Sequence, residues 1–586
     1  MKPSMLPRAC LVLVLAATPT LAPAADRHEP GAPSPFSRFV DRYLASFSRY
    51  HPSIAAGNGI HDHDGDLEDF SAPVIRAEVV WLRSTRHALD SMDEVSLTPD
   101  ECVDRRILQG IVDGWLLDLD TVRSWRRNPM VYVAALSDGL HDLVTMDSSP
   151  PEHRATQIIS KLRGIPRLMA SARRNIVAPP RLFVERSIVM LGGVSELLSH
   201  DLPLAFTSVH DAALRQRLAR AAASAVRAID AYRKELETRG LASATGSYAI
   251  GTAAVEARYR AEELIDLDAA TLLAIGEREL ASTQATFART AAQVDARRPA
   301  LEVWRGVQKT HPAPGELAPA ARALVDELFA FIDARHLVEL PANEHVTVIP
   351  APAYDLGLAS MHSSPPLEPH PVQSFYYVTD ADPTWPVERQ NTWLEAFNYA
   401  TLADITAHEV APGHYVHSLF MHQTPGKIRR IWVGLNPFPQ PSSGQDGWAH
   451  YAEQMVSDEG FRADDPRYRL AQTAEALTRI CRLIAGLKLH SGAWTVEQAT
   501  DLFEQHGHLI HAAAYREAVR GTYDPTYGGY FLGKLAALKL RRDYQAARGD
   551  AFSLREFHER VMTNGIAPWW AHRQLMLTGD TRPVVE

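Results

Sequence analysis

The sequence contains little cysteine, has no long apolar run after its first residues and lacks an excess of positive charge. Beyond the first residues only Cys102 and Cys481 remain. They are too few for an all-thiolate zinc site, so a bound metal would need imidazole and carboxylate ligands. The two cysteines would either pair in an oxidising compartment or stay as small buried side chains. The formal net charge of -10 argues against nucleic-acid binding, because phosphate recognition needs clustered lysine and arginine.

The first residues are typical of an export signal. Lys2 and Arg8 give a positive start, an apolar stretch follows from Ala9 to Ala22, and a small-residue cleavage site comes next. Residues 1–24 are therefore predicted to be a signal peptide, and the mature protein is expected in the periplasm or outside the cell. No stable membrane anchor is expected, because no later segment has the ~20 apolar residues of a spanning helix. Cys10 also precedes the apolar stretch, whereas a lipid-bearing cysteine would follow it.

Helical periodicity dominates the rest of the chain. The spacing of Leu214, Leu218, Ala222 and Ala225 is one example of a single apolar stripe. Only two runs, 345–349 and 374–379, are rich in β-forming residues. We therefore expect a mainly α fold with a small β element and two halves flanking an active-site cleft. The halves are predicted as an N-terminal helical region, 25–310, and a C-terminal catalytic region, 311–586.

A histidine and glutamate motif, His-Glu-Val-Ala-Pro-Gly-His, occupies residues 408–414. In the H-E-x-x-H motif of zinc peptidases the two histidines lie ~40° apart around a helix, and both reach one ion. The longer spacing here puts them ~120° apart on a regular helix. Pro412 and Gly413 would break or bulge the helix and return His414 to the side of His408. Alternatively, the Pro-Gly pair simply ends the helix, with His414 in a loop and Glu409 solvated.

A third ligand and a base are needed to complete a hydrolytic zinc site. Zinc bound by histidines usually takes a carboxylate as well, keeps one position for water and uses a nearby glutamate to activate that water. Glu409 is placed for the role of base. Asp446 and Glu453 are both candidates for the third ligand. Asp446 would otherwise be a helix cap, and Glu453 a surface charge.

Three separated stretches, 408–415, 446–454 and 520–535, resemble one family. It is catalogued as domain of unknown function 885 and is similar to the helical zincins of the oligopeptidase and angiotensin-converting-enzyme type. The resemblance implies that His408 and His414 bind Zn²⁺ and that Glu409 is the general base. It also implies that Asp446 is the third ligand, although the family usually carries the longer glutamate at that place.

The stretch 520–535 supplies the remaining candidates. By similarity to the related peptidases, a tyrosine would donate a hydrogen bond to the oxyanion formed during hydrolysis. Tyr527 is the first candidate for this role and Tyr530 the second. Arg520 would bind a substrate carboxylate through its guanidinium. The structural alternatives are that the tyrosines pack over the following helix and that Arg520 anchors the turn.

These features predict a zinc-dependent hydrolase, and more specifically a peptidase in which Glu409 assists the attack of zinc-bound water on a peptide bond. One alternative is a zinc-dependent amidase or esterase acting on small non-peptide substrates. Another is an inactive binding or scaffold protein, suggested by the aspartate at 446. The acidic loop 61–66 is expected to be solvated rather than to bind a functional metal. Oligomeric state and cleavage specificity stay open at this stage.

Overall fold

The computed structural model describes residues 33–145, 149–340, 346–351, 358–431 and 442–586. The predicted signal peptide, 1–24, lies outside the described residues. Helices account for most of the described chain, which confirms the expected mainly α class. Within these ranges no helix combines the length and apolar character needed to cross a membrane.

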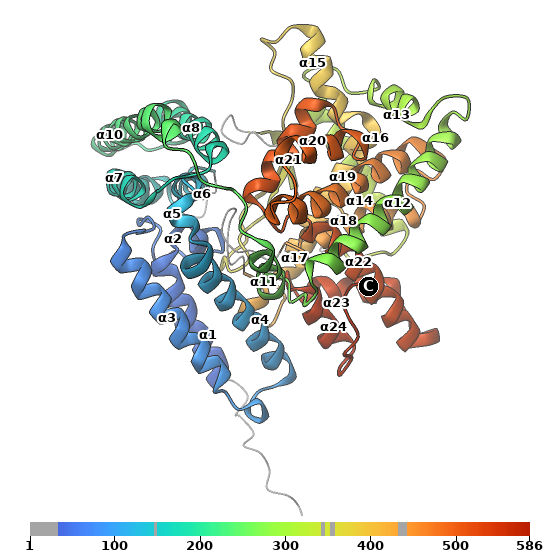
Figure 1. The fold of residues 1–586 in the computed structure, drawn as a ribbon, viewed down its shortest axis with the longest axis horizontal. Helices are drawn as coiled ribbons and strands as arrows, with labels where there is room; N and C mark the ends of the chain where they lie inside the picture. Colours follow the sequence, from blue (N-terminus) through green and yellow to red (C-terminus); the bar gives the residue numbers. More distant parts are fainter. Residues whose placement is uncertain (1–32, 146–148, 341–345, 352–357, 432–441) are drawn as a thin grey trace, which may run out of the picture.

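The N-terminal half is a set of packed helices that fills the blue-to-teal side of the molecule (Figure 1). The helix α1 buries one apolar stripe, which includes Val40, Tyr43 and Phe47. The helix α10 buries its own stripe against α7. The helices are α1 (Pro35–Tyr50), α2 (Pro52–Gly57), α3 (Ala72–Asp90), α4 (Pro99–Leu116), α5 (Ser124–Arg127), α6 (Met130–Thr145), α7 (Pro151–Asn175), α8 (Arg181–Glu196), α9 (Leu202–Ala205) and α10 (Ala212–Glu235).

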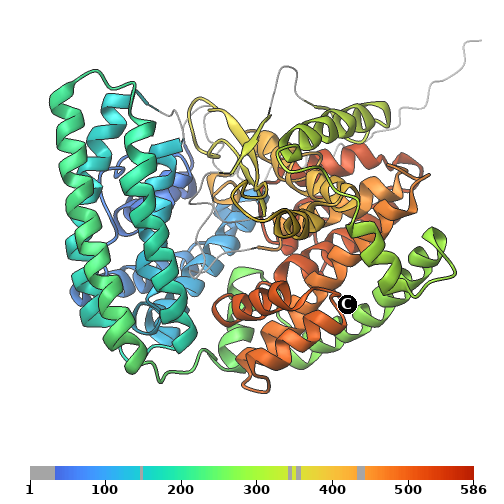
Figure 2. The same ribbon diagram turned by 90° about the horizontal axis from the view of Figure 1, so that it is seen from above.

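The C-terminal half is built around the long helix α19, which packs along α12. In Figure 2 its green, orange and red helices form the side opposite to the N-terminal helices. They are α11 (Thr252–Glu262), α12 (Ala269–Val294), α13 (Ala300–Gln308), α14 (Leu317–Ala334), α15 (Val387–Leu394), α16 (Tyr399–Glu409), α17 (His414–Met421), α18 (Asp446–Asp458), α19 (Pro466–His490), α20 (Val496–Gln505), α21 (His511–Tyr523), α22 (Gly529–Arg548), α23 (Leu554–Thr563) and α24 (Trp569–Met576).

Two hydrophobic cores divide the described chain. The first core is formed mainly by buried side chains of residues Phe36 to Leu236. The second core is formed by buried side chains of residues Val255 to Val585. The change from one core to the other lies between Leu236 and Val255, and α11, α12 and α13 pack against α19. Ile428 and Ala571 cross over and pack into the first core, so the halves share apolar contacts.

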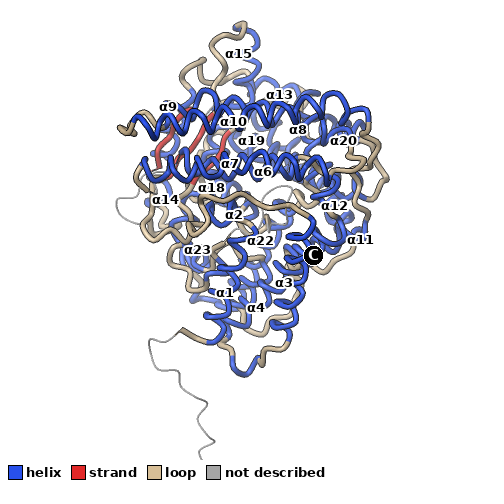
Figure 3. Tube along the Cα trace, turned by 90° about the vertical axis from the view of Figure 1, so that its left-hand side faces the viewer, coloured by secondary structure: helices blue, strands red, loops and turns tan. Residues whose placement is uncertain are grey.

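A three-stranded sheet lies in the C-terminal half and appears in red in Figure 3. The strands β1 (Val346–Pro350) and β3 (Ser374–Val378) confirm the two predicted β runs and pair in parallel. The strand β2 (Ala359–His362) pairs antiparallel with β3, giving the order β1-β3-β2. It was not predicted, because Ala-Ser-Met-His has little β propensity of its own. Since β2 contacts both α16 and α17, the sheet edge lies against the 408–414 motif.

The two cysteines do not pair. Cys102 and Cys481 are both free, and Cys481 is buried in the second core. It therefore serves as a small apolar side chain, which is one of the two states expected from the sequence.

One ion pair of His61 holds the acidic loop 61–66 to the segment between β2 and β3. His61 Nδ1 lies 2.9 Å from Asp64 Oδ2, and His61 Nε2 lies 2.7 Å from Glu368 Oε2. The hydrogen bond with Asp64, supported by that with Glu368, raises the pKa of His61 to about 9 against the opposing effect of burial. A protonated His61 thus links the N-terminal half to the segment between β2 and β3.

We expect the stability difference between wild type and His61→Gln to shrink as the pH rises. A raised pKa means that folding favours the protonated ring, so its contribution is complete below the unfolded-state pKa of about 6.5. It is lost as the pH rises through about 9. Thermal unfolding midpoints of both proteins, measured from about pH 6 to about pH 10, should converge at the alkaline end. A constant difference over that range would contradict the linkage.

Candidate metal centre

The 408–414 motif spans a break between two helices. The helix α16 ends at Glu409, α17 begins at His414, and the bond between Ala411 and Pro412 is cis. Gly413 is required at this break, because a Cβ there would lie 1.6 Å from the carbonyl oxygen of His408. The sharp reversal turns the second histidine back toward the first, so the rings of His408 and His414 have centroids 4.8 Å apart at an interplanar angle of 88°.

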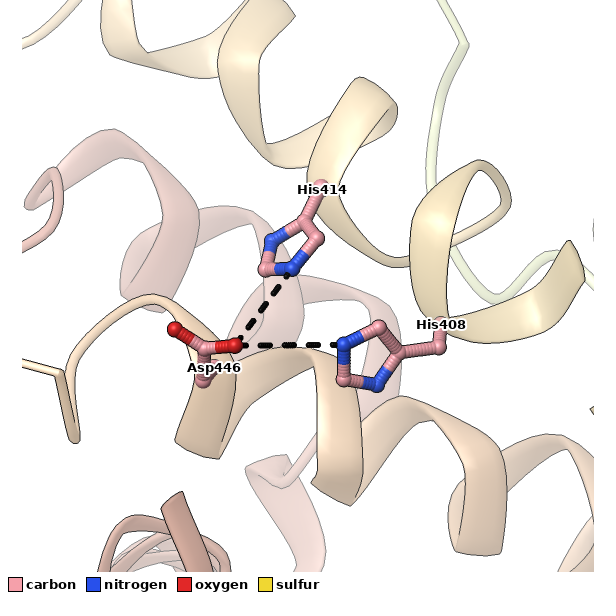
Figure 4. Close-up of side chains that lie close together, drawn as sticks. All are labelled: His408, His414 and Asp446. Atoms are coloured by element: carbon pink, nitrogen blue, oxygen red, sulfur yellow. Dashed lines mark ion pairs between the residues drawn. The ribbon is translucent and has the colours of Figure 1, made fainter. Parts of the chain in front are cut away.

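The two imidazoles face one carboxylate (Figure 4). Asp446 Oδ1 lies 4.0 Å from His408 Nε2 and 3.8 Å from His414 Nε2. Ligand atoms on a tetrahedral zinc are ~3.3 Å apart, given bond lengths of ~2.0 Å, so modest side-chain movement would close the set on an ion. Among the described residues, this is the one group of three histidine, cysteine or acidic side chains with ligand atoms within 4.8 Å of one another. The donor set of two imidazoles and a carboxylate fits zinc.

The start of α18 is fixed by close contacts. Gly447, next to Asp446, packs directly on Gly533 of α22, and a Cβ at 447 would lie 2.5 Å from the Cα of Gly533. Trp448 Nε1 donates a hydrogen bond of 2.9 Å to the carbonyl of Pro412. The helix that carries Asp446 is therefore tied both to α22 and to the break that carries the two histidines.

Glu453, the other candidate for the third ligand, occupies a different place. It is fully buried, with Oε1 at 2.7 Å from His408 Nδ1 and Oε2 at 2.9 Å from His450 Nδ1. Burial acts to raise its pKa, but Arg479, whose Nη2 donates a 2.8 Å hydrogen bond, holds the pKa of Glu453 well below its usual range. Because an ionised Glu453 can only accept a hydrogen bond, His408 carries a proton on Nδ1. Its Nε2 is left facing Asp446, which is the arrangement of a metal-ligating histidine.

Glu409 lies at the same centre without being one of the three clustered side chains. Burial among protein atoms, with Asp446 adding to the effect, raises the pKa of Glu409 to about 7. A hydrogen bond from the backbone of Met361 in β2 acts in the opposite direction. A carboxyl group with a pKa near neutrality suits a group that accepts a proton and later gives it up.

The structure separates the two tyrosines of the 520–535 stretch. Tyr527 has no exposed surface, and its hydroxyl donates to the carbonyl of Glu517 at 3.4 Å. Tyr530 accepts a hydrogen bond from Arg520 Nη2. Burial raises the pKa of Tyr530, Arg520 opposes this effect, and the charge of Asp446 raises the pKa further. Tyr530 is therefore the tyrosine in electrostatic contact with the candidate metal centre.

Arg520 anchors the turn that follows α21. Its guanidinium forms an ion pair of 3.1 Å with Asp524 in addition to the hydrogen bond with Tyr530. Its side chain is about one-third exposed, at 29%. The structural alternative given above for Arg520 is thus present in the fold.

Three further polar residues near the candidate metal centre were not predicted from the sequence. Arg479 joins Glu453 to Glu475, while His450 contacts the second oxygen of Glu453. Asp404 lies one turn before His408 on α16, is 1% exposed, and neither of its oxygens has a hydrogen-bond partner among the described residues. The i to i+4 spacings of Asp404 to His408 and of Glu475 to Arg479 are the sequence signals that point to Asp404 and Arg479. His450 lies three residues before Glu453 on the same helix.

The chain is thus a mainly helical protein with a histidine, histidine and aspartate cluster at a broken helix. It belongs to the DUF885 family, described as "Bacterial protein of unknown function (DUF885)", whose profile matches residues 52–575. No curated protein matches the sequence.

Two solved structures share the fold. One is "The structure of a putative lipoprotein of unknown function from Shewanella oneidensis", with 22% identity, a TM-score of 0.76, and coverage of 93% of this chain and 100% of the other. The second is "The crystal structure of the putative lipoprotein from Colwellia psychrerythraea", with 18% identity, a TM-score of 0.77, and coverage of 93% and 98%. At these identities the likeness establishes the architecture.

Proposed function

We propose that this protein is a zinc-dependent hydrolase and that its substrates are peptides. The observation that carries the proposal is the convergence of His408 Nε2, His414 Nε2 and a carboxylate oxygen of Asp446 beside Glu409. Two imidazoles, one carboxylate and a separate glutamate form the donor set and base of a hydrolytic zinc site.

Each residue has a defined task in this proposal. Zinc, when held by the three ligands, polarises a carbonyl oxygen and makes a water molecule more acidic. Glu409 accepts the proton of the attacking water and later delivers it to the leaving nitrogen. Glu453 keeps His408 oriented by accepting a hydrogen bond from its Nδ1–H group. The buried Arg479 keeps Glu453 ionised for that purpose.

A peptide substrate is favoured over a small amide or ester by the position of β2. In the described sheet β2 pairs with β3 on one side. The backbone of Met361 reaches Glu409 from β2, so the other side of the strand faces the metal centre. An extended peptide can add to such an edge through main-chain hydrogen bonds, which would lay a scissile bond beside Glu409.

We assign the oxyanion donor to Tyr530 rather than to Tyr527, and Arg520 to the orientation of Tyr530. The hydroxyl of Tyr527 is used by the Glu517 carbonyl, whereas Tyr530 lies in the field of Asp446. Arg520 is committed to Asp524 and Tyr530. We therefore assign it this orienting role in preference to binding a substrate carboxylate.

Tyr530→Phe is expected to lower kcat by roughly 10²–10³-fold with little change in KM, the effect of losing one oxyanion donor. Tyr527→Phe is the matched control, because it removes a hydroxyl bonded to a backbone carbonyl and should leave kcat nearly unchanged. Steady-state kinetics on one peptide substrate measure both. Equal losses in the two variants, or a larger loss in Tyr527→Phe, would reverse the assignment.

The proposal is tested by metal content and by substrate panels. Purified wild-type protein should contain about one zinc per chain and should lose hydrolysis of a mixed peptide library when a chelator removes the metal. Cleavage confined to small amides or esters would instead favour an amidase or esterase. Protein that purifies without zinc, and whose properties a chelator leaves unchanged, would indicate a binding or scaffold protein.

We also propose that the protein is exported. The start of the chain is typical of a signal peptide, and each of the two structural relatives is described as a "putative lipoprotein". Mass spectrometry of the protein recovered from the periplasm should show loss of residues 1–24. Recovery of the intact chain from the cytoplasm alone would contradict export.

A further inference from the structure

A buried carboxylate from the far end of α11 holds the loop that leads into α18. Glu263 directly follows α11 and is 1% exposed. Its Oε1 accepts hydrogen bonds from Ser442 N at 2.8 Å and Ser442 Oγ at 3.0 Å, and Ser443 N donates to both carboxylate oxygens at 3.1 and 3.2 Å. One side chain thus binds two successive backbone N–H groups and a hydroxyl.

The contact continues to Asp446 through the backbone. The N–H of Asp446 donates to the carbonyl of Ser442 at 3.0 Å, and the carbonyl of Ser443 accepts a 2.7 Å hydrogen bond from Trp569 Nε1. The loop from Ser442 to Asp446 is therefore held at its N-H groups by Glu263 and at a carbonyl by Trp569. Its last residue is the candidate third ligand.

This carboxylate is costly to the fold. Glu262 and Glu263 are consecutive, buried, and located at the C-terminal end of a helix, where the helix dipole disfavours anions. An apolar pair of similar volume would avoid the loss of hydration of two carboxyl groups. Residues that oppose stability are concentrated at functional sites. The loop from Ser442 to Asp446, which Glu263 holds, is therefore a candidate for a functional role.

We propose that Glu263 is a positioning residue for Asp446, and that it sets the geometry of the third metal ligand. This inference rests on the proposed zinc site. Glu263 keeps the Ser442 to Asp446 loop closed on α11, so that the Asp446 carboxylate stays within reach of His408 and His414. Because aspartate is shorter than glutamate by one methylene, its position depends more strongly on the backbone that carries it.

Glu263→Gln tests the inference. The glutamine oxygen can replace Oε1 as the acceptor for Ser442, but the NH2 group then faces the N–H of Ser443 that Oε2 accepts in the wild type. The loop should therefore relax, and the affinity for zinc should fall about 10–100-fold, as for other outer-shell partners. Zinc affinity is measured by competition with a chromophoric chelator, and the visible spectrum of the Co²⁺-substituted protein reports the ligand set. Glu262→Gln is the matched control, since this neighbour is similarly buried but contacts Arg258 and Thr526. Its zinc affinity and Co²⁺ spectrum should equal those of wild type.

A double-mutant cycle separates positioning from general destabilisation. If Glu263 acts through Asp446, then Glu263→Gln should have no further effect on zinc affinity in an Asp446→Ala background. Equal losses in both backgrounds would overturn the inference while leaving the zinc site intact. Ser442→Ala, which removes a single hydroxyl contact, serves if Glu263→Gln fails to fold, and it should show a smaller loss of the same kind. Unchanged affinity in Ser442→Ala would count against the inference. A wild-type protein that binds no zinc would remove the proposed function and this inference together.

Discussion

Glu409→Gln is expected to retain zinc and to lose peptide hydrolysis by roughly 10²–10⁴-fold, the range that general-base catalysis contributes. Glu409 is outside the His408, His414 and Asp446 cluster, so the metal ligands stay in place. Glutamine has nearly the same shape but cannot accept a proton from water. Zinc content and kcat, measured on the same preparation, show whether the two properties separate.

The conservative variant Glu409→Asp is the control for this prediction. It keeps a carboxylate but withdraws it by one methylene, so it should retain more turnover than Glu409→Gln. A Glu409→Gln protein as active as wild type would remove Glu409 from the mechanism. Loss of zinc in that variant would instead assign Glu409 to the metal ligands.

His408→Ala and His414→Ala are each expected to lose zinc. Each removes one of the two imidazoles that face Asp446. The fall in affinity should exceed the roughly 10–100-fold cost of losing an outer-shell partner. Equilibrium dialysis against a zinc buffer, followed by elemental analysis, measures the loss.

His417→Ala is the matched control on the same helix. His417 is buried and its Nε2 contacts the carbonyl of Gly565, so it serves the fold rather than the metal centre. Its loss should lower thermal stability but leave zinc bound. Zinc retained at full affinity in His408→Ala would show that the ligand set is wrong.

Local patterns predicted the helical part of the fold well. The predicted stripe of α10 is buried as its spacing indicated, because a helix presents residues three and four apart on one face. The helix break before His414 also follows from local chemistry, since Pro412 and Gly413 disrupt helical hydrogen bonding. The strand β2 was missed because it is stabilised by pairing with β3 and by contact with α16, neither of which is visible in four residues.

Sequence alone therefore determined the helical class, the broken helix and the short set of candidate metal ligands. Only the tertiary structure distinguished Asp446, which faces both imidazoles, from Glu453, which accepts a hydrogen bond from the Nδ1–H of His408. It likewise distinguished Tyr530 from Tyr527. Both members of each pair have suitable chemistry, so residue type cannot separate them. The distinction depends on how α18 and α22 pack against α16 and α19, and such contacts between distant segments are set by the shapes of the whole core.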